Sequence, residues 1–267
     1  MTPGFLLASY NVLADAYIRR DRYPHTALAL LEPERRLPAL ADRIAALDAD
    51  LICLQEVEVA AFERVAARLA ALGYAGELML KGGRRPDGCA LFHRAGRFDL
   101  LRSARLEYRE NLAGTVSSGH VAQFATYSDG ARVLGVANTH LKWDPPETPP
   151  DQRHGERQIR QLLDARIPDC TGWVVCGDFN ATPTSGVLRI LGEAGFVPGH
   201  GADAPTCNAN RRPQTIDYIC HDHSLRATPL APPPVLADTP LPGPGEPSDH
   251  VPLAARLDWS GAPGPAA

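Results

Sequence analysis

The order of apolar segments along the chain is the feature that most restricts its fold. Two segments, 37–47 and 62–72, repeat apolar residues with the spacing of an amphipathic helix, and a short apolar run at 51–54 lies between them. Four strand-like runs then follow one another with no clear helix between them: 89–93, 98–106, 121–127 and 132–139. This part of the chain therefore predicts a helix, a strand, a helix and then consecutive strands.

The later part of the chain returns to mixed elements. The pattern there predicts a helix near 154–166, a strand at 173–177, a helix near 185–194, and strands at 216–220 and 251–257. Strict alternation of strand and helix would imply one parallel, doubly wound sheet, and the consecutive strands in the middle do not fit it. We therefore expect an α/β protein in which mixed sheets pack on each other with helices outside.

The prolines indicate loops and not domain boundaries. The chain has 25 prolines in 267 residues, concentrated at 145–150 and 229–247. Proline lacks a backbone donor and cannot continue a strand ladder, so both stretches are predicted to be stiff loops. The segment after each loop is too short to form a separate core. We expect a single domain over 1–259 and a disordered tail at 260–267.

Composition and charge exclude several classes of protein. Hydrophobic residues make up 44% and charged residues 22%, which is ordinary globular usage, and the formal net charge is −4. No apolar run approaches the roughly 20 residues needed to span a bilayer. The mild acidity argues against a protein that coats duplex nucleic acid, because that binding needs many lysines and arginines. A nucleic acid, if bound, would be bound in a local pocket.

The cysteines predict thiols and not disulfides. Four of the six lie inside apolar runs that resemble buried strands: Cys53, Cys89, Cys176 and Cys220. No pair has the C-x-x-C spacing of zinc or redox sites, so buried reduced thiols are the better interpretation. Reduced thiols and the absence of a signal-peptide pattern predict a cytoplasmic protein. We expect a monomer that does not bind membranes.

Polar residues gather where the apolar strands stop or start. The segments 10–11, 55–56, 138–140, 177–180, 215–218 and 248–250 supply the candidate site residues Asn11, Glu56, His140, Asp178, Asn180, Asp217, Asp249 and His250. The carboxyl ends of strands in α/β folds converge on a cleft that commonly holds the functional site. Six such segments in one chain therefore predict one shared site.

Each candidate also has a purely structural explanation. Glu56 would suit a cap of the helix that follows it, and Asn11 and Asp178 would suit Asx turns. The others would suit a turn, a strand end or a solvated loop: Asn180, His140, Asp249 and His250. Taken singly these explanations compete well, but their coincidence at six strand ends favours function.

The oxygen-rich side chains of this set predict a hard metal ion. Carboxylates from Glu56, Asp178 and Asp249, with the amides of Asn11 and Asn180, suit Mg²⁺ or Mn²⁺ and not zinc. The sequence does not decide between one ion and two.

The histidines predict phosphoryl chemistry. His140 and His250 are suited to hydrogen-bond a phosphoryl oxygen or transfer a proton near neutral pH. Asp217 is suited to orient one of these imidazoles, as carboxylates do in catalytic triads. Metal-assisted attack of water on phosphorus is the reaction that this set serves best.

The same segments resemble the endonuclease/exonuclease/phosphatase superfamily, and most closely its deadenylase branch, which includes the carbon-catabolite-repression nucleases, nocturnin and angel. The matching motifs are, in chain order, Ser9–Asp15, Leu54–Glu58, Asp87–Phe92, Asn138–Pro145, Gly177–Asn180, Ile216–Ile219 and Pro247–His250. The resemblance spans about residues 5–257. It implies a four-layer α/β sandwich, two packed mixed β-sheets flanked by helices, with one active site at one edge of the sheets.

The resemblance also implies roles for the site residues. Glu56 would be the principal metal ligand with Asn11 beside it, and Asp249 a second ligand or a support. Asp178 would orient the attacking water, Asn180 would hold the phosphate, and His140 and His250, with Asp217 behind His250, would stabilise the oxyanion. We further expect substrate contacts from Asp87, Asn138, Lys142, Trp143 and Arg211.

The chain departs from the deadenylase pattern in ways that leave its substrate open. Those enzymes usually carry a tryptophan before an arginine in the first helical region, and segment 30–36 keeps arginine without tryptophan. No adaptor-binding extension is visible before residue 5. We expect a phosphodiesterase acting on a nucleotide or a single-stranded nucleic-acid 3′ end, with arginine pairs and Trp143 at the rim. The alternatives are a phosphatase acting on a nucleotide 2′-phosphate or an inositol phosphate, and a catalytically silent binding module.

Overall fold

Two six-stranded mixed sheets pack face to face in the computed structural model, which describes residues 4–110, 115–145, 147–149, 152–208 and 212–261. The first sheet has the order β11 (Leu225–Leu230), β12 (Leu253–Trp259), β1 (Phe5–Asn11), β2 (Leu51–Glu58), β4 (Asp87–Arg94) and β3 (Tyr74–Leu80). The second has the order β5 (Asp99–Arg109), β6 (Ser117–Ser128), β7 (Val133–His140), β8 (Gly172–Asp178), β10 (Asp217–His221) and β9 (Val197–Pro198).

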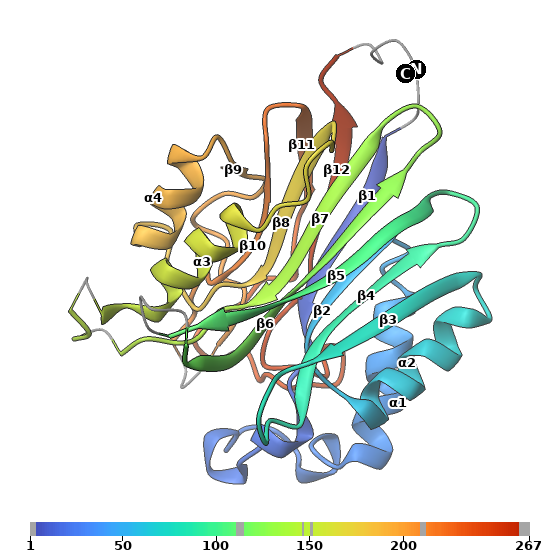
Figure 1. The fold of residues 1–267 in the computed structure, drawn as a ribbon. Coiled ribbons are helices and arrows are strands. Elements are labelled where there is room, and N and C mark those ends of the chain that lie inside the picture. The colour runs from blue at the N-terminus through green and yellow to red at the C-terminus, as the bar shows by residue number, and fades with distance from the viewer. Residues whose placement is uncertain (1–3, 111–114, 146, 150–151, 209–211, 262–267) are drawn as a thin grey trace.

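Helices cover the outer face of each sheet, which completes a four-layer α/β sandwich (Figure 1). The helices are α1 (Pro33–Ala45), α2 (Val59–Ala70), α3 (His154–Asp164) and α4 (Gly186–Glu193), with short 3₁₀ turns η1 (Asp15–Tyr17), η2 (Arg20–Arg22) and η3 (Leu28–Leu30). Helices α1 and α2 pack on the first sheet, and α3 and α4 on the second. The predicted fold class is confirmed.

Three apolar clusters hold the layers together. One lies between the sheets and includes Leu7, Leu91 and Val174, while the other two lie between each sheet and its helices. Strands buried on both faces explain why their sequences read as continuous apolar runs. The helical spacing at 37–47 and 62–72 corresponds to α1 and α2. Gly73, just beyond the second helix, has a left-handed φ of +82°, which glycine adopts without strain.

Three strands escape the sequence pattern. Strands β3, β9 and β11 each lie at an edge of a sheet and expose many of their side chains. An edge strand needs neither a buried face nor strict alternation, so its sequence carries little signal. Strand β2 also continues past Leu54, where the apolar run ends, because a bulge lets the chain resume pairing at Val57.

The described residues also test the expectations about the cysteines and about membrane-spanning helices. All six cysteines are free, and Cys53, Cys89, Cys176 and Cys220 are buried. No helix in the described ranges is long and apolar enough to cross a membrane. Residues 262–267 of the predicted tail lie outside the described residues.

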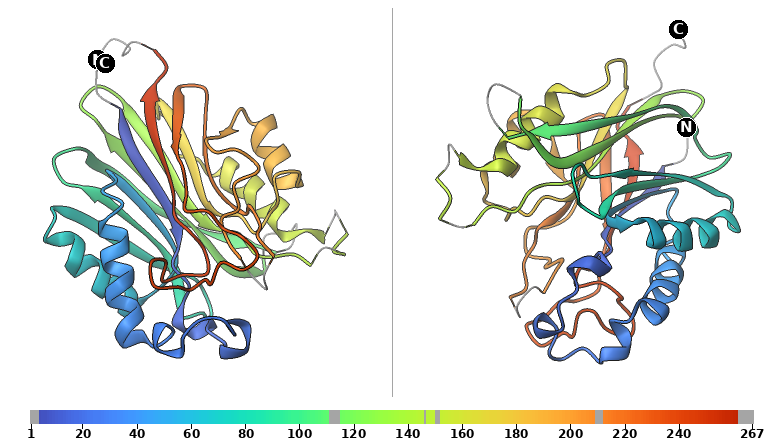
Figure 2. Two further views of the ribbon diagram at one scale, coloured as in Figure 1. Left: turned by 180° about the vertical axis from the view of Figure 1, so that it is seen from behind. Right: turned by 60° about the horizontal axis from the view of Figure 1, so that its bottom comes forward.

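The strand directions bring the candidate residues to one end of the sandwich. Strands β1 and β2 are parallel neighbours in one sheet, and β7 and β8 are parallel neighbours in the other. Asp217 begins β10 directly opposite Asp178, because β10 runs antiparallel to β8. The segment after β1 and the segment before β12 meet below these strands (Figure 2).

Candidate active site

A cluster of buried oxygen-bearing side chains joins the two sheets at this end. The Asn11 amide donates to Glu56 Oε1 at 3.1 Å and to Asp178 Oδ2 at 2.9 Å, so it links a strand of each sheet. Glu56 Oε2 accepts the backbone N–H of Ala14 at 3.0 Å. The predicted metal ligands Asn11 and Glu56 and the predicted water-orienting Asp178 therefore lie together.

Glu56 reaches this cluster because of the bulge in β2. Its backbone has a φ of +57°, and the pairing of β2 with β4 shifts between Gln55 and Val57. A left-handed bulge residue re-aims its side chain, and a non-glycine residue held this way is strained by about 1–3 kcal/mol. The capping alternative for Glu56 is not realised, because helix α2 has Glu58 at its N-cap with no side-chain cap hydrogen bond.

Asp178 and Asn180 come after a position that only glycine can occupy without a clash. Gly177 has a φ of +139°, and a Cβ there would lie 1.8 Å from the Thr139 carbonyl oxygen. Asp178 Oδ1 accepts the backbone N–H of Asn180 at 2.8 Å, and Asn11 Oδ1 accepts that of Leu13 at 3.0 Å. The Asx turns weighed as structural alternatives are thus present within the same cluster, and they orient its side chains.

His250 and Asp217 form a buried pair on the second sheet's side. His250 Nδ1 lies 2.8 Å from Asp217 Oδ2, which also accepts the Thr206 hydroxyl at 2.6 Å. Burial lowers the pKa of His250, but the Asp217 carboxylate more than offsets this and holds the pKa well above its usual value. His250 Nε2 lies 3.8 Å from Asp178 Oδ2, so a cationic imidazole faces the carboxylate cluster.

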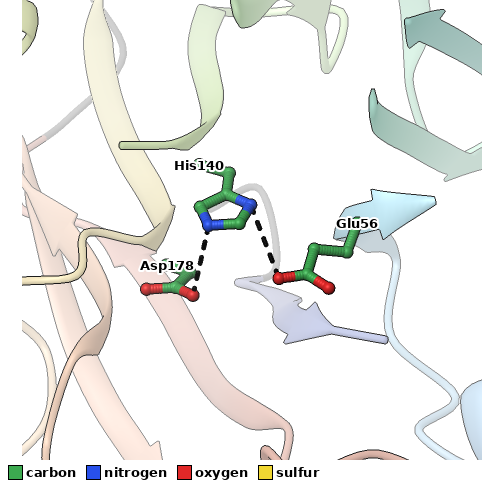
Figure 3. A group of neighbouring side chains, drawn as sticks. All are labelled: Glu56, His140 and Asp178. Carbon is green, nitrogen blue, oxygen red and sulfur yellow. Dashed lines mark ion pairs between the residues drawn. The ribbon is translucent and has the colours of Figure 1, made fainter. Parts of the chain in front are cut away.

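His140 lies between the two carboxylates of the cluster (Figure 3). Its Nδ1 lies 3.9 Å from Glu56 Oε1, and its Nε2 lies 3.6 Å from Asp178 Oδ2 and 3.1 Å from Asn180 Nδ2. Burial lowers the pKa of His140 well below its usual value, and the nearby Lys81 ammonium lowers it further. A neutral imidazole therefore faces a cationic one across Asp178.

Lys81 is a site residue that the sequence did not reveal. Its buried ammonium donates to Asp87 Oδ2 at 2.6 Å and to His140 Nδ1 at 3.2 Å. Tyr17 donates to the other Asp87 oxygen at 2.7 Å. Asp87 was expected to contact substrate, but it is fully buried and paired, so the structure corrects that prediction: Asp87 holds Lys81 against His140.

Asn138 requires the same correction. It is fully buried between the sheets, where Oδ1 accepts from Gln55 and Nδ2 donates to the carbonyls of Leu54 and Ala90. Every hydrogen-bonding atom of the side chain is used within the protein, and none is left for a substrate. Asn138 ties the two sheets together beneath the site.

Asp249 lies beside the cluster and not within its closest group. Its Oδ2 accepts the Tyr23 hydroxyl at 3.0 Å, which ties it to the segment after β1. After burial itself, the charge of Asp249 is the strongest influence that raises the pKa of Glu56. This placement fits the expectation of a second ligand or a support, and Tyr23 is a further residue that the sequence did not reveal.

The donor set fits a hard divalent cation. Ligand atoms of Glu56, His140 and Asp178 lie within 4.8 Å of one another. Those of Asp178, Asp217 and His250 do as well, but the cationic His250 is a donor to anions and not a metal ligand. Burial raises the pKa of Asp178 to about 7, and Asp217 adds to the rise. Buried carboxylates that repel one another in this way are stabilised by a cation between them.

Two of the remaining predicted substrate residues, Lys142 and Trp143, lie at the rim. Trp143 is 59% exposed and, with Lys142, lines a cavity of about 390 Å³ that also reaches Asn180. Lys142 Nζ is paired with Glu110 Oε1 at 2.7 Å. Arg211 lies outside the described residues.

Comparison with known proteins gives consistent matches. A sequence profile of the Endonuclease/Exonuclease/phosphatase family matches residues 8–250. Bovine (Bos taurus) 2′,5′-phosphodiesterase 12 is 26% identical over 320 residues, which cover 94% of this chain but 51% of that relative, so the chain spans about half its length. The human nocturnin catalytic domain with bound sulfate aligns with a TM-score of 0.74 at 26% identity, over 97% of this chain and 94% of that chain. ANGEL2, a 2′,3′-cyclic phosphatase, aligns with a TM-score of 0.77 at 22% identity, over 95% of both chains.

Proposed function

Because the chain belongs to the endonuclease/exonuclease/phosphatase family, we propose that it is an Mg²⁺- or Mn²⁺-dependent phosphodiesterase acting on a nucleotide or a single-stranded nucleic-acid 3′ end. Hydrolysis of phosphate esters follows from the family, and a phosphodiesterase is among its relatives. The observation that carries the metal-dependent mechanism is the convergence of Asn11, Glu56 and Asp178 between two histidines.

The carboxylate cluster would bind the metal ion and activate the attacking water. Glu56, with Asn11 beside it, would hold the ion, which supplies Lewis-acid polarisation of a phosphoryl oxygen. Asp178 has a pKa of about 7, so its carboxylate is matched to accept a proton from the attacking water near neutral pH. Asn11 and the backbone N–H of Asn180 each hold one oxygen of Asp178, which fixes its direction.

The two histidines would stabilise the negative charge on the phosphoryl oxygens. His250 is held cationic by Asp217, so its Nε2–H is a preorganised donor to the charge that develops on phosphorus. His140 is neutral, and its Nε2 lies 3.1 Å from Asn180 Nδ2, so we place both nitrogens beside the same phosphoryl oxygens. The bond from phosphorus to the leaving oxygen would break on the side opposite the attacking water, and that oxygen would take its proton from solvent.

Two alternative functions are compatible with the same site residues. A phosphatase of small phosphorylated metabolites would use the same residues on a terminal phosphate, and a silent binding module would keep the fold without turnover. The buried pairing of His250 with Asp217 favours catalysis, because binding alone does not need a cationic imidazole aimed at a carboxylate cluster.

The first test is turnover of bis-(p-nitrophenyl) phosphate. We expect hydrolysis with Mg²⁺ or Mn²⁺, its abolition by EDTA, and a loss of at least about 100-fold in Glu56→Gln. Glu63→Gln removes an exposed carboxylate from α2 and serves as the matched control with unchanged turnover. Absence of metal-dependent turnover on any phosphate ester would instead support the silent module.

The second test separates diesterase from phosphatase. A panel of oligo(A), mixed RNA, single-stranded DNA, NADP⁺ and inositol phosphates is compared by kcat/KM. We expect the highest values on the nucleic acids. A preference for NADP⁺ or inositol phosphates would replace the diesterase assignment with the phosphatase.

A further inference from the structure

A second cavity, here called the intersheet cavity, lies between the two sheets at the side where β3 and β5 are the last strands (Figure 1). Its volume is about 240 Å³, and its lining comes from β3, β4, β5 and β6. The Ser103 hydroxyl donates to Glu77 Oε2, so β5 and β3 are joined across the gap between the sheets. The lining shares no residue with the candidate active site, so this cavity is a separate feature of the molecule.

Gln123 presents a buried acceptor without a donor at the intersheet cavity. Its side chain lines the cavity, and the residue is only 1% exposed. Its Nε2 donates to the backbone carbonyl of Glu77 at 3.2 Å, which fixes the side of the amide that carries the oxygen. Its Oε1 has no hydrogen-bond partner among the described residues. Because a buried acceptor left unpaired is costly, a donor is expected to reach Oε1 from the cavity.

The charge around the intersheet cavity is negative. Glu77 is the one charged side chain in the described lining, and no lysine or arginine lines the cavity to offset it. His93 also lines the cavity, but burial lowers its pKa, so the imidazole is neutral near pH 7. Burial raises the pKa of the Tyr127 hydroxyl, and Glu77 is among the charges that raise it further, so the carboxylate lies close to this ring. A cation is therefore favoured over an anion.

The walls of the intersheet cavity suit a flat ligand of one ring. The rings of His93 and Tyr127 contact each other with their centroids 5.3 Å apart, and Leu91 and Leu100 add apolar surface. Aromatic faces attract cations, which agrees with the charge of Glu77. The volume is below the roughly 300–1,000 Å³ of sites for drug-sized molecules, so the ligand has to be small.

We propose that the intersheet cavity binds a small, flat organic cation with N–H donors, such as an aromatic amidine. One N–H would donate to Gln123 Oε1, the Glu77 carboxylate would offset the charge, and the ring would lie against Tyr127. The site does not depend on the proposed hydrolysis, because none of these groups belongs to the carboxylate cluster.

Three probes of matched shape test the ligand class. Benzamidine is a cation, benzamide is neutral and benzoate is an anion, while all three carry the same ring. Each is titrated calorimetrically into the full chain with saturating Mg²⁺. We expect benzamidine to bind at one site, benzamide to bind about 5-fold more weakly or worse, and benzoate not to bind. Binding of benzoate as tight as that of benzamidine would overturn the proposal. Absence of benzamidine binding would overturn it too and leave a cavity that holds water only.

Two variants test the contacts of the probe separately. Gln123→Leu removes the acceptor at similar volume and should weaken benzamidine by about 10-fold or more. Glu77→Gln, at an exposed position, should weaken benzamidine by about 2- to 5-fold and leave benzamide unchanged. Glu63→Gln is the control with unchanged affinity. If Gln123→Leu does not fold, Glu77→Gln and the three probes still decide, and unchanged benzamidine affinity in Glu77→Gln would refute the role of charge.

The active-site carboxylates are the competing place for a cation, and they are tested directly. Glu56→Gln should bind benzamidine with unchanged affinity, and excess bis-(p-nitrophenyl) phosphate should not displace it. A loss of affinity in Glu56→Gln, or displacement by the ester, would place benzamidine in the active site and overturn the proposal. Benzamidine binding in a chain that hydrolyses no phosphate ester would refute the proposed function and leave the intersheet cavity as a ligand site.

Discussion

Replacement of Arg36 probes how the loops of the site are held. Its side chain is buried, and its guanidinium donates to the carbonyls of Val12, Leu13 and Pro247 and to the Asp15 carboxylate. The first two carbonyls follow Asn11 in the chain, and the third precedes Asp249 and His250. One side chain in α1 therefore fixes two loops that are more than 200 residues apart.

The magnitude follows from the groups that Arg36→Met leaves unpaired. Three buried carbonyls lose their donor, at a cost of about 1–3 kcal/mol for each group that water cannot reach. Asp15 keeps 23% of its side-chain surface exposed, so water recovers part of that pairing. Three such groups sum to about 3–9 kcal/mol, and the lower part of this range overlaps the about 3–5 kcal/mol seen when one partner of a buried pair is removed.

Urea unfolding followed by circular dichroism measures this cost. We expect Arg36→Met to lower the free energy of unfolding by about 3–5 kcal/mol, and the matched control Arg35→Met, at an exposed position of the same helix, by under about 0.5 kcal/mol. Turnover of the folded fraction should fall as well, because both loops lose their shared anchor. A stability loss below about 1 kcal/mol, or full turnover in the folded variant, would refute the reasoning.

Two further predictions concern the second sheet. His250→Ala should lower turnover by about 100- to 1,000-fold, because the Nε2–H of His250 acts on the transition state. Calorimetry should show little change in Mg²⁺ affinity, and a loss of metal affinity equal to the loss of turnover would contradict this role. Gly177→Ala should cost about 2–4 kcal/mol of stability, because its Cβ would meet the Thr139 carbonyl at 1.8 Å in addition to the strain of its φ. Gly96→Ala, with a φ of +77° and no atom within 4 Å, isolates the strain alone, and equal losses in both variants would argue against the clash.

The sequence predicted the buried strands and the polar residues at their ends. Runs such as Val133–Ala137 and Trp173–Cys176 are apolar because both faces of those strands are covered, and that burial is written directly into residue type. Asn11 and Asp178 each end a buried strand, so they could be placed at one edge without coordinates, whereas Asn138 also follows an apolar run but lies inside β7.

Edge strands and paired side chains carried a weaker signal. The exposed strand β3 has no alternation to detect, yet Lys81 follows directly at its end. Asp87 and Asn138 lie in motifs that match the family, so both were expected to contact substrate. The structure shows instead that Asp87 accepts a hydrogen bond from Lys81 and Asn138 accepts one from Gln55. A sequence gives residue types, but the partner of a polar group depends on segments far away in the chain.

The sequence by itself determined which residue types reach the candidate site: carboxylates, amides and two histidines near the ends of successive strands. Tertiary structure decided how these groups are tuned. The bulge at Glu56, the cationic state of His250 beside Asp217 and the neutral state of His140 beside Lys81 each arise when two distant segments meet. The physical reason is that strand register, burial and charge proximity act through space, and the order of residues along the chain does not record distance between segments.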